Sequence, residues 1–456
     1  MHTDQFSRRQ WLQGLGAGLA IGASVGSSLS SRAWAQALPN SGTANPARLV
    51  VVFLRGAYDG LSAFVPYADA DYYRMRPNIA IAAPDGSAQT ALRLDGSFAL
   101  HPALAPLLPL WQQGVFGFVP AAGLPAPNRS HFDAQYQMEI AQVGKTSASS
   151  GWLNRLAGQR NTPTAMASTH NTPTAMGVGE ANPAILAGEA LVKLIARGQS
   201  AERTGVLANP ATRQALLDLY AGDDALGKAF RKGADSRTQS AQELNQEKTT
   251  AQARQTMNRP LDKDGTPAST QAQTAQMLAA SNGAADPVGL QLDAQHLGTL
   301  MRNDRKLSVG FLSAGGWDTH ANQGNASGQL ANNLANLARG ILQLRQDFSE
   351  SGDVIVVMSE FGRTSAENGT KGTDHGFGNA IWLIGNRING GRWHGQWTGL
   401  AQGNLNEGRD LPAHHDYRAV LAQVLRNKFA LTDSAMATLL PGAQWDTRLD
   451  SLMRQG

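Results

Sequence analysis

The alternation of short apolar runs with longer amphipathic segments constrains the fold of this chain more than any other feature. Runs rich in Val, Ile, Leu and Phe are typical of strands buried on both faces, and they occur at Arg48–Leu54, Val115–Pro120, Leu307–Ala314, Val354–Met358 and Ala380–Ile384. Leu, Ala and Val recur at helical spacing over Leu290–Met301, Asn322–Ser349 and Asp416–Phe429. This alternation predicts an α/β fold, a three-layer sandwich in which a central, mostly parallel sheet is flanked by helices.

The N-terminus has the order of an export signal. Arg8 and Arg9 precede an apolar, Gly/Ala-rich stretch from Leu15 to Val25 and small-residue cleavage sites in Ala33–Ala37. That order predicts a twin-arginine signal peptide over residues 1–37, which is cleaved. The alternative, a transmembrane anchor, needs ~20 strongly apolar residues, and this stretch is shorter and interrupted by glycine. We therefore expect the twin-arginine translocase as a partner, a periplasmic or otherwise secreted location, and no stable membrane span after cleavage.

The absence of cysteine and the distribution of charged residues exclude several functions. Cysteine is absent, which excludes thiolate metal ligands and cysteine nucleophiles and means that the fold needs no disulfide. The whole chain has a formal net charge of +4, and the loss of three arginines and one aspartate with residues 1–37 leaves +2. Because no basic block or basic stripe with interleaved aromatic residues is present, we expect no nucleic-acid partner.

The remaining chain, residues 38–456, suits a single large α/β domain with polar insertions. One insertion lies near 156–180, where the sequence Asn-Thr-Pro-Thr-Ala-Met occurs twice, at Asn161–Met166 and Asn171–Met176. The repeat indicates a local duplication in a surface loop. The other insertion, near 233–285, is rich in Gln, Ala, Thr, Ser and charged residues, which predicts an exposed helix or a mobile segment.

Acidic and histidine side chains mark a candidate site. They follow predicted strands or lie in the glycine-rich loop before the last one: Asp59, Asp318, His320, Glu360 and His375. The carboxyl ends of strands in an open α/β sheet meet along one crevice, so these side chains can converge. Converging carboxylates and imidazoles are costly to desolvate without a cation. The pattern predicts a divalent metal, zinc, manganese, magnesium or calcium, although each residue taken singly also suits a turn.

A candidate nucleophile lies just before a predicted helix. Ser130 stands where a loop turns into that helix, which is the position of an N-cap. The same position favours catalysis, because a helix N-terminus presents unpaired N–H groups to an anionic substrate and a metal lowers the pKa of a hydroxyl. Arg129 would hold anionic oxygens. His131 is either a base or a packing histidine, and we favour packing.

Taken together, the motifs resemble the twin-arginine-exported family known as domain of unknown function 1501 (DUF1501). The pieces that carry the resemblance span nearly the whole mature chain: Asp59–Leu61, Asn128–Ala134, Gly151–Arg155, Gly316–His320, Ser359–Thr364 and Gly372–Gly376. That family is similar, in fold and in the order of its polar motifs, to the superfamily of alkaline phosphatases, sulfatases and phosphoglycerate mutases.

The resemblance implies an alkaline-phosphatase-like sandwich, a cleft that holds one or two metals, and a Ser or Thr nucleophile. Carried over by position, it implies Ser130 as the nucleophile and these metal ligands: Asp59, Asp318, His320, Glu360 and His375. Phe361 stands where the superfamily commonly has a second-metal histidine, and the sulfatase signature is absent near Ser130. These departures argue against a complete two-metal site and against a typical sulfatase.

These features predict an exported, metal-dependent hydrolase of phosphate or sulfate esters that acts on an anionic small molecule or polymer. Ser130 would attack, Arg129 and Arg363 would neutralise developing charge, and water would release the covalent intermediate. The alternative is a non-catalytic periplasmic binding module that keeps the superfamily fold. Two features favour that alternative: Phe361 stands in place of the second-metal histidine, and the long polar insertion offers a docking surface.

Overall fold

The structure is a computed structural model that describes residues 47–456, except 145–146, 160–171, 255–270, 430 and 455–456. The predicted signal peptide and its paired arginines therefore lie outside the described residues. No helix in the described part of the chain is both long enough and apolar enough to cross a bilayer.

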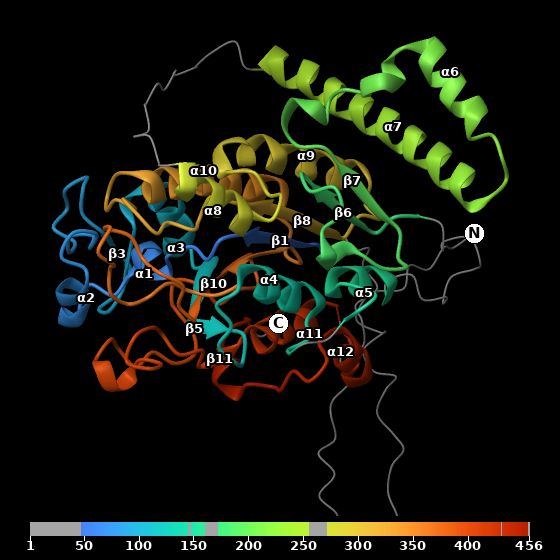
Figure 1. Cartoon of the computed structure of the whole chain (residues 1–456). Helices are drawn as coiled ribbons and strands as arrows, with labels where there is room; N and C mark the ends of the chain where they lie inside the picture. Colours follow the sequence, from blue (N-terminus) through green and yellow to red (C-terminus); the bar gives the residue numbers. More distant parts are fainter. Residues whose placement is uncertain (1–46, 145–146, 160–171, 255–270, 430, 455–456) are drawn as a thin grey trace, which may run out of the picture. The chain divides into compact units, whose positions relative to one another are not determined.

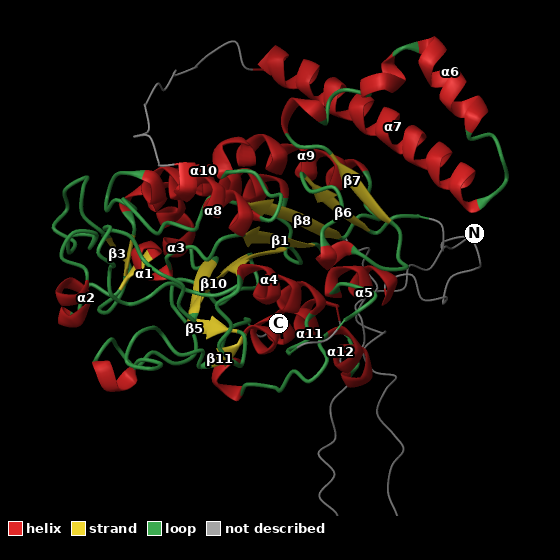
Figure 2. Ribbon diagram, viewed as in Figure 1, coloured by secondary structure: helices red, strands yellow, loops and turns green. Residues whose placement is uncertain are grey.

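An eight-stranded sheet forms the centre of the described chain (Figures 1 and 2). Its strands are β1 (Leu49–Leu54), β5 (Phe116–Gly123), β6 (Ala175–Val178), β7 (Val192–Ile195), β8 (Val309–Ala314), β9 (Val354–Ser359), β10 (Asn379–Ile384) and β11 (His415–Asp416). The spatial order is β11-β5-β10-β9-β1-β8-β6-β7. Only β10 runs against its neighbours, β5 and β9; the other pairings are parallel. The predicted mostly parallel α/β sheet is thus confirmed.

Helices cover both faces of this sheet because successive residues of each strand point to opposite sides. Val50 and Leu54 of β1 share one core with helices α9 (Leu290–Asn303) and α10 (Gln329–Asp347). Val51 and Phe53 share the other core with four further helices: α4 (His131–Ile140), α5 (Trp152–Gln159), α11 (Tyr417–Phe429) and α12 (Asp433–Leu439). All six side chains of β1 are buried, which explains why its sequence is continuously apolar rather than alternating.

All five predicted strands and all three predicted helices are confirmed, with boundaries that shift by up to seven residues. Strands β6, β7 and β11 were not predicted. They have only two to four residues, and so short a run gives no periodicity to detect.

A small antiparallel sheet and several short helices lie in the connections. The small sheet contains β2 (Phe64–Val65), β3 (Leu92–Arg93) and β4 (Ala99–Leu100). The short α-helices are α1 (Gly60–Ala63), α2 (Ala70–Met75) and α3 (Leu108–Gln112). Short 3-10 helices occupy Pro102–Leu107, Ala184–Leu186, Gly198–Ser200, Gly205–Ala208, Pro287–Gly289, Gln402–Asn404 and Thr447–Leu449.

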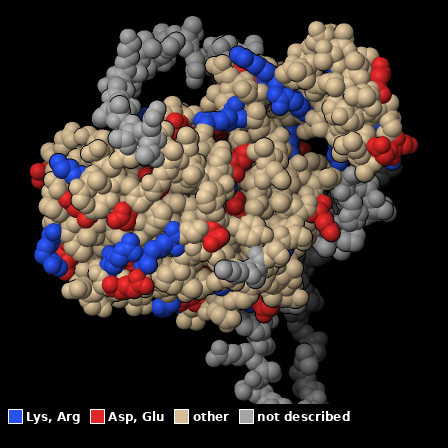
Figure 3. Space-filling view, in the orientation of Figure 1, with Lys and Arg blue, Asp and Glu red and all other residues tan. Residues whose placement is uncertain are grey.

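The polar insertions contain regular structure. The first copy of the repeated hexapeptide lies outside the described residues, whereas the second copy ends in β6, where Ala175 and Met176 are fully buried in the main sheet. That second copy is therefore not a surface loop. The region near 233–285 contains most of α7 (Ala225–Arg254) and α8 (Gln271–Ser281), preceded by α6 (Pro210–Leu219). On the face shown in Figure 3, Lys and Arg side chains form small groups with acidic side chains nearby rather than one broad basic patch.

Candidate metal centre

Several loops meet at one end of the main sheet, at the carboxyl ends of its parallel strands. Strands β1, β8 and β9 are parallel and in register, so that Leu54 pairs with both Ala314 and Ser359 at their carboxyl ends. Because β10 is antiparallel, it begins at that end, where Asn379 pairs with Ala122 of β5. The loops that follow β1, β5, β8 and β9 and the loop that precedes β10 therefore meet there.

Glycine allows two of these loops to touch. Gly56, two residues after the end of β1, has φ +112°, and a Cβ at this position would lie 2.9 Å from the backbone nitrogen of Asp318. The backbone N–H of Gly56 also donates to Oε1 of Glu360 at 2.8 Å. Only glycine adopts this backbone conformation at little cost. The loops after β1, β8 and β9 are thereby held together.

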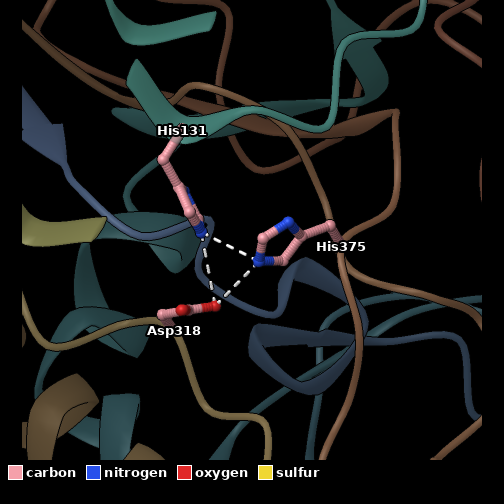
Figure 4. Close-up of side chains that lie close together, drawn as sticks. All are labelled: His131, Asp318 and His375. Atoms are coloured by element: carbon pink, nitrogen blue, oxygen red, sulfur yellow. Dashed lines mark hydrogen bonds and ion pairs between the residues drawn. The ribbon is translucent and has the colours of Figure 1, made fainter. Parts of the chain in front are cut away.

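Three imidazoles, those of His131, His320 and His375, converge on the carboxylate of Asp318 at these strand ends. Figure 4 shows two of them, His131 and His375, with Asp318. His131 is the first residue of α4, Asp318 and His320 follow β8, and His375 precedes β10. Nε2 of His375 lies 3.0 Å from Nε2 of both His131 and His320. The distances from Oδ1 of Asp318 to these nitrogens are 2.9 Å for His320, 3.2 Å for His375 and 3.4 Å for His131.

Each imidazole has its other nitrogen bound to a protein oxygen. Nδ1 of His131 lies 2.7 Å from Oε1 of Glu360. Nδ1 of His375 lies 2.8 Å from the backbone oxygen of Arg129, and Nδ1 of His320 lies 3.0 Å from Oδ1 of Asp374. An oxygen acceptor at Nδ1 places the proton there in a neutral imidazole, so that Nε2 keeps its lone pair. The three lone pairs therefore face one another. Lone pairs in this arrangement repel unless a proton or a cation lies among them.

Asp318 is held as an anion. It is 3% exposed, and Oδ1 accepts a hydrogen bond from the Arg363 guanidinium at 2.6 Å. Burial alone would raise the pKa of this carboxyl, but the three histidines and Arg363 lower it far below its ordinary value. Its Oδ2 atom is buried and has no hydrogen-bond partner among the described residues. A buried acceptor without a partner is unusual in a folded protein, and this oxygen is available to a cation or another ligand.

The charge of His131 responds to its two carboxylate neighbours. Burial lowers the pKa of this imidazole, but hydrogen bonds with Asp318 and Glu360 outweigh burial and raise the pKa to about 9. The contact with His131 in turn lowers the pKa of Glu360 despite full burial of that carboxyl. Without a metal, His131 thus carries the proton that reduces repulsion within the cluster.

The residues fit a divalent cation. The ligand atoms of His131, Asp318 and His375 lie within 4.8 Å of one another. In a tetrahedral site with metal–ligand bonds of about 2.0–2.1 Å, neighbouring ligand atoms are about 3.3 Å apart, close to the separations in this cluster. Oxygen acceptors at the Nδ1 atoms are the usual partners of metal-binding histidines. His320 is equally close to Asp318 and His375 and is a fourth candidate ligand.

A small cavity next to the cluster involves the polar insertion. The cavity measures about 30 Å³ and is lined by Asp318 and His320 together with Gln273, Gln276, Met277, Ala321 and Gln329. Gln273, Gln276 and Met277 belong to α8, and Nε2 of Gln135 donates to the backbone oxygen of Ala280 in the same helix. Helix α8 therefore lies against the candidate site.

Asp59, expected from the sequence to be a metal ligand, instead forms a buried ion pair. Both of its carboxylate oxygens bind the guanidinium of Arg76, at 2.6 and 3.1 Å. Oδ2 also accepts hydrogen bonds from Ser62 and Gln323, each at 2.7 Å. Arg76 outweighs the effect of burial and lowers the pKa of Asp59. The structure does not bring this carboxylate into the group around Asp318.

Glu360 and Arg363, expected as a metal ligand and as a charge-neutralising group, act on neighbouring side chains. Oε1 of Glu360 receives the Nδ1 proton of His131, which orients that imidazole. The guanidinium of Arg363 is 2% exposed and binds Asp318 and Thr373. Both residues adjoin the cluster, and their contacts orient its side chains.

Ser130 and Arg129 precede the cluster in the chain. Ser130 is the N-cap of α4, and its exposed hydroxyl accepts from the backbone N–H of Asp133 at 3.4 Å. The guanidinium of Arg129 binds Glu407 at 2.8 Å and Asp410 at 3.0 Å. The backbone of Arg129 also orients His375. Ser130 keeps the N-cap position predicted for it, directly next to His131.

His131 has a polar environment that its sequence position did not predict. We favoured a packing role, and its ring does lie 4.8 Å from the ring of Phe361. The structure nonetheless aims its Nε2 into the centre of the cluster. One signal could have identified it: His131 opens the helix that follows a strand end, the same type of position as the other candidate ligands.

The fold and the cluster define an α/β protein with a candidate metal centre at the carboxyl ends of its parallel strands. The chain belongs to the family described as protein of unknown function DUF1501, whose profile matches residues 46–440. A search among curated proteins finds no match.

Several solved structures show a distant likeness. The alkaline phosphatase of the Antarctic bacterium TAB5 is 12% identical, covers 75% of this chain and 92% of its own, and gives a TM-score of 0.30. A variant of that enzyme with Mg bound in its M3 site gives the same identity and TM-score, with 75% and 91% coverage. A protein from Pyrococcus horikoshii is 10% identical, with a TM-score of 0.24 and 75% and 86% coverage. At these TM-scores the likeness carries no argument about activity.

Proposed function

We propose that this protein is an exported, metal-dependent hydrolase of phosphate or sulfate esters. The observation that carries the proposal is the convergence of three imidazole Nε2 atoms on the carboxylate of Asp318, with each Nδ1 bound to an oxygen. Three nitrogen ligands favour zinc over manganese, magnesium and calcium, which are better suited to oxygen ligands. A bound cation would polarise the ester and lower the pKa of an attacking hydroxyl.

Ser130 is the proposed nucleophile. Its hydroxyl is exposed at the N-terminus of α4, one residue before His131. The first N–H groups of this ten-residue helix favour an anion at the same end. Attack by Oγ would form a bond to phosphorus or sulfur as the ester oxygen leaves with a proton, and water would then release the acid. Arg129, 30% exposed at its side chain, would lie beside the anion.

The test begins with the metal content of the purified mature protein. We expect bound zinc by elemental analysis, and turnover of p-nitrophenyl esters of phosphate or sulfate that a chelator abolishes. His375→Gln should remove both metal and turnover, because Nε2 of His375 contacts the other two imidazoles. A protein that binds no metal, or whose turnover is unchanged in His375→Gln, would refute the proposal.

The role of Ser130 requires a variant that preserves its capping function. Ser130→Ala removes the hydroxyl and the cap together, and loss of an N-cap costs about 1 kcal/mol of stability. Ser130→Asn removes the hydroxyl but keeps a side-chain oxygen that caps a helix equally well. Both variants should lose turnover, and only Ser130→Ala should lose stability. Full turnover in Ser130→Asn would show that this hydroxyl is not the nucleophile.

A non-catalytic binding module is the second candidate. The observation that favours it is that the anion-binding groups have partners within the protein: Arg129 binds two carboxylates, and the Ser130 hydroxyl caps a helix. Such a module would bind metal and anions without turnover. Trapping of a phosphorylated or sulfated Ser130 after brief incubation with substrate would eliminate it.

Export is tested separately. Arg8→Lys combined with Arg9→Lys keeps the charge of the signal but alters the paired arginines that the twin-arginine translocase reads. We expect the doubly substituted precursor to stay in the cytoplasm, whereas Arg32→Lys, in the same peptide, should be exported normally. Equal export of both precursors would contradict the assignment.

A further inference from the structure

Two buried arginines lie beside the cluster and bind carboxylates at the strand ends. Arg76 is fully buried, and all its guanidinium nitrogens have acceptors. Besides Asp59, these are the hydroxyl of Ser62 at 3.2 Å and the backbone oxygens of Ser365 at 2.8 Å and Thr364 at 2.9 Å. An arginine held by this many bonds is a permanent charge of the site, because its pKa keeps it protonated.

The second arginine, Arg363, is joined to the first through the chain. It contacts Asp318, and its neighbour Thr364 gives its backbone oxygen to Arg76. A hydrogen-bond chain also joins Asp59 to Arg363: Gln323 donates to Asp59 at 2.7 Å and accepts from the hydroxyl of Thr373 at 3.0 Å, and that hydroxyl accepts from Arg363 at 3.1 Å. The Asp59–Arg76 pair and the Asp318–Arg363 pair are therefore parts of one polar centre rather than separate structural ion pairs.

The charges of the side chains in this centre are balanced best by one cation. Counting only the side chains that bind the histidine cluster or Arg76 directly, three carboxylates are buried, those of Asp59, Asp318 and Glu360, and the guanidiniums of Arg76 and Arg363 accompany them. With neutral imidazoles, the buried set has one net negative charge. Asp374, whose side chain is 50% exposed, is screened by water. A single divalent ion would change the charge of the buried set to one net positive charge.

Among the residues that the structure describes, no second group of three acidic or histidine side chains is placed to hold a cation. Asp59 is the acidic side chain that could serve it, but its oxygens already accept bonds from Arg76, Ser62 and Gln323. The guanidinium of Arg76 stands where such a cation would bind, and displacing it would leave a buried arginine without its counter-charge, which is strongly unfavourable. The charge that a second metal would supply is thus already part of the chain.

We infer that the centre takes a single divalent cation and that Arg76 replaces a second one. The loaded site then has one net positive charge and favours a singly charged ester, a phosphate diester or a sulfate monoester, over a doubly charged phosphate monoester. This preference rests on the proposed function, whereas the metal count does not depend on turnover.

Metal content separates the outcomes. Elemental analysis of the mature protein loaded with excess zinc and then desalted should give one zinc per chain. Two zinc ions per chain would overturn the inference and leave the proposed function intact. A count of zero would refute the proposed metal centre itself.

Arg76→Gln tests the replacement directly. Without the guanidinium, Asp59 becomes a buried carboxylate without a counter-charge, and the variant should take up a second zinc ion, with a melting temperature that rises with added zinc. Arg48→Gln is the matched control, because Arg48 is 3% exposed and paired with Asp353 at the opposite end of the sheet. It should bind one zinc. Retention of a single zinc in folded Arg76→Gln would overturn the role of Arg76.

A double variant keeps the inference testable if Arg76→Gln does not fold. Asp59→Asn combined with Arg76→Gln removes both charges and preserves the shape of the pair. It should still bind one zinc, because neither side chain is a ligand. Loss of that zinc would show that Asp59 holds the cation and would overturn the inference.

Esters with a common leaving group test the charge preference. Bis(p-nitrophenyl) phosphate and p-nitrophenyl sulfate have one negative charge, and p-nitrophenyl phosphate has nearly two above pH 7. We expect kcat/KM to be highest for one of the singly charged esters, and comparison of those two distinguishes a diesterase from a sulfatase. A higher kcat/KM for p-nitrophenyl phosphate would overturn the preference, and turnover of none of the three would count against the proposed function instead.

Discussion

Replacing Glu360 by glutamine tests whether the carboxylate behind His131 contributes to metal binding. Oε1 of Glu360 accepts the Nδ1 proton of His131 at 2.7 Å, and its side chain is fully buried. Glutamine keeps a carbonyl acceptor of the same shape but removes the charge. A charge-assisted hydrogen bond contributes about 1.5–3 kcal/mol and a neutral one about 1 kcal/mol, so the change costs about 0.5–2 kcal/mol, with a midpoint of about 1.3 kcal/mol.

This cost corresponds to a Kd for zinc that is about 10-fold weaker, within the roughly 10- to 100-fold range for groups that orient metal-binding histidines. Competition titration with a chelator measures the Kd directly. The titration is done above pH 9, the pKa of His131 in the metal-free protein, because at lower pH the zinc must also displace a proton and the variant changes that competition.

Asp353→Asn is the control for Glu360→Gln. Asp353 is a buried carboxylate that pairs with Arg48 at the opposite end of the sheet, so its loss should reduce stability but leave the zinc Kd unchanged. If the Kd of Glu360→Gln stays within about threefold of the wild-type value, the carboxylate does not support a metal ligand in the way proposed. Equal weakening in both variants would point to a general loss of structure instead.

Three further predictions address other parts of the molecule. Burial lowers the pKa of His101 from 6.5 to about 4. The free energy of unfolding should therefore fall as the pH drops from 6.5 to 4, by about 1.4 kcal/mol per pH unit and about 3 kcal/mol in all. Urea unfolding of His101→Gln should lack that slope. Gly372→Ala should weaken zinc binding, because its Cβ would lie 2.3 Å from the backbone carbon of His320, whereas Gly369→Ala in the same loop meets nothing within 4 Å and should bind zinc normally. Arg55→Gln leaves the buried carboxylate of Glu139 and the half-buried carboxylate of Glu180 without their counter-charge. It should cost about 3–5 kcal/mol in denaturant unfolding, and a loss below about 1 kcal/mol would contradict that expectation.

Local sequence identified most of the sheet because buried parallel strands have few other compositions available. The runs at β1, β8 and β9 are continuously apolar, since helices cover both of their faces. The antiparallel direction of β10 was not predictable, because an apolar run has no direction. Strand β6 was misassigned as part of a loop, since its four residues lie within a repeated polar segment.

Part of the candidate site was also visible in the sequence. Asp318, His320 and His375 were predicted together from glycine-rich loops near strand ends, and the structure gathers them within about 3 Å of one another. Their roles as ligands remain a proposal. Asp59 was predicted as a ligand and His131 as a packing residue, whereas in the structure Asp59 pairs with Arg76 and Nε2 of His131 lies 3.4 Å from Asp318.

The reason is that the role of a polar side chain depends on which charge reaches it. Asp59 follows a strand as Asp318 does, and nothing in its own loop reveals that Arg76 fills its coordination positions. His131 at the start of a helix has the same local sequence whether it packs or binds. The sequence by itself determined the layered fold and the end of the sheet where polar loops gather, because these follow from local apolar patterns and strand direction. Tertiary structure alone decided which imidazoles converge and which carboxylate is already neutralised, because those interactions join residues up to 244 positions apart and depend on distances of a few ångströms.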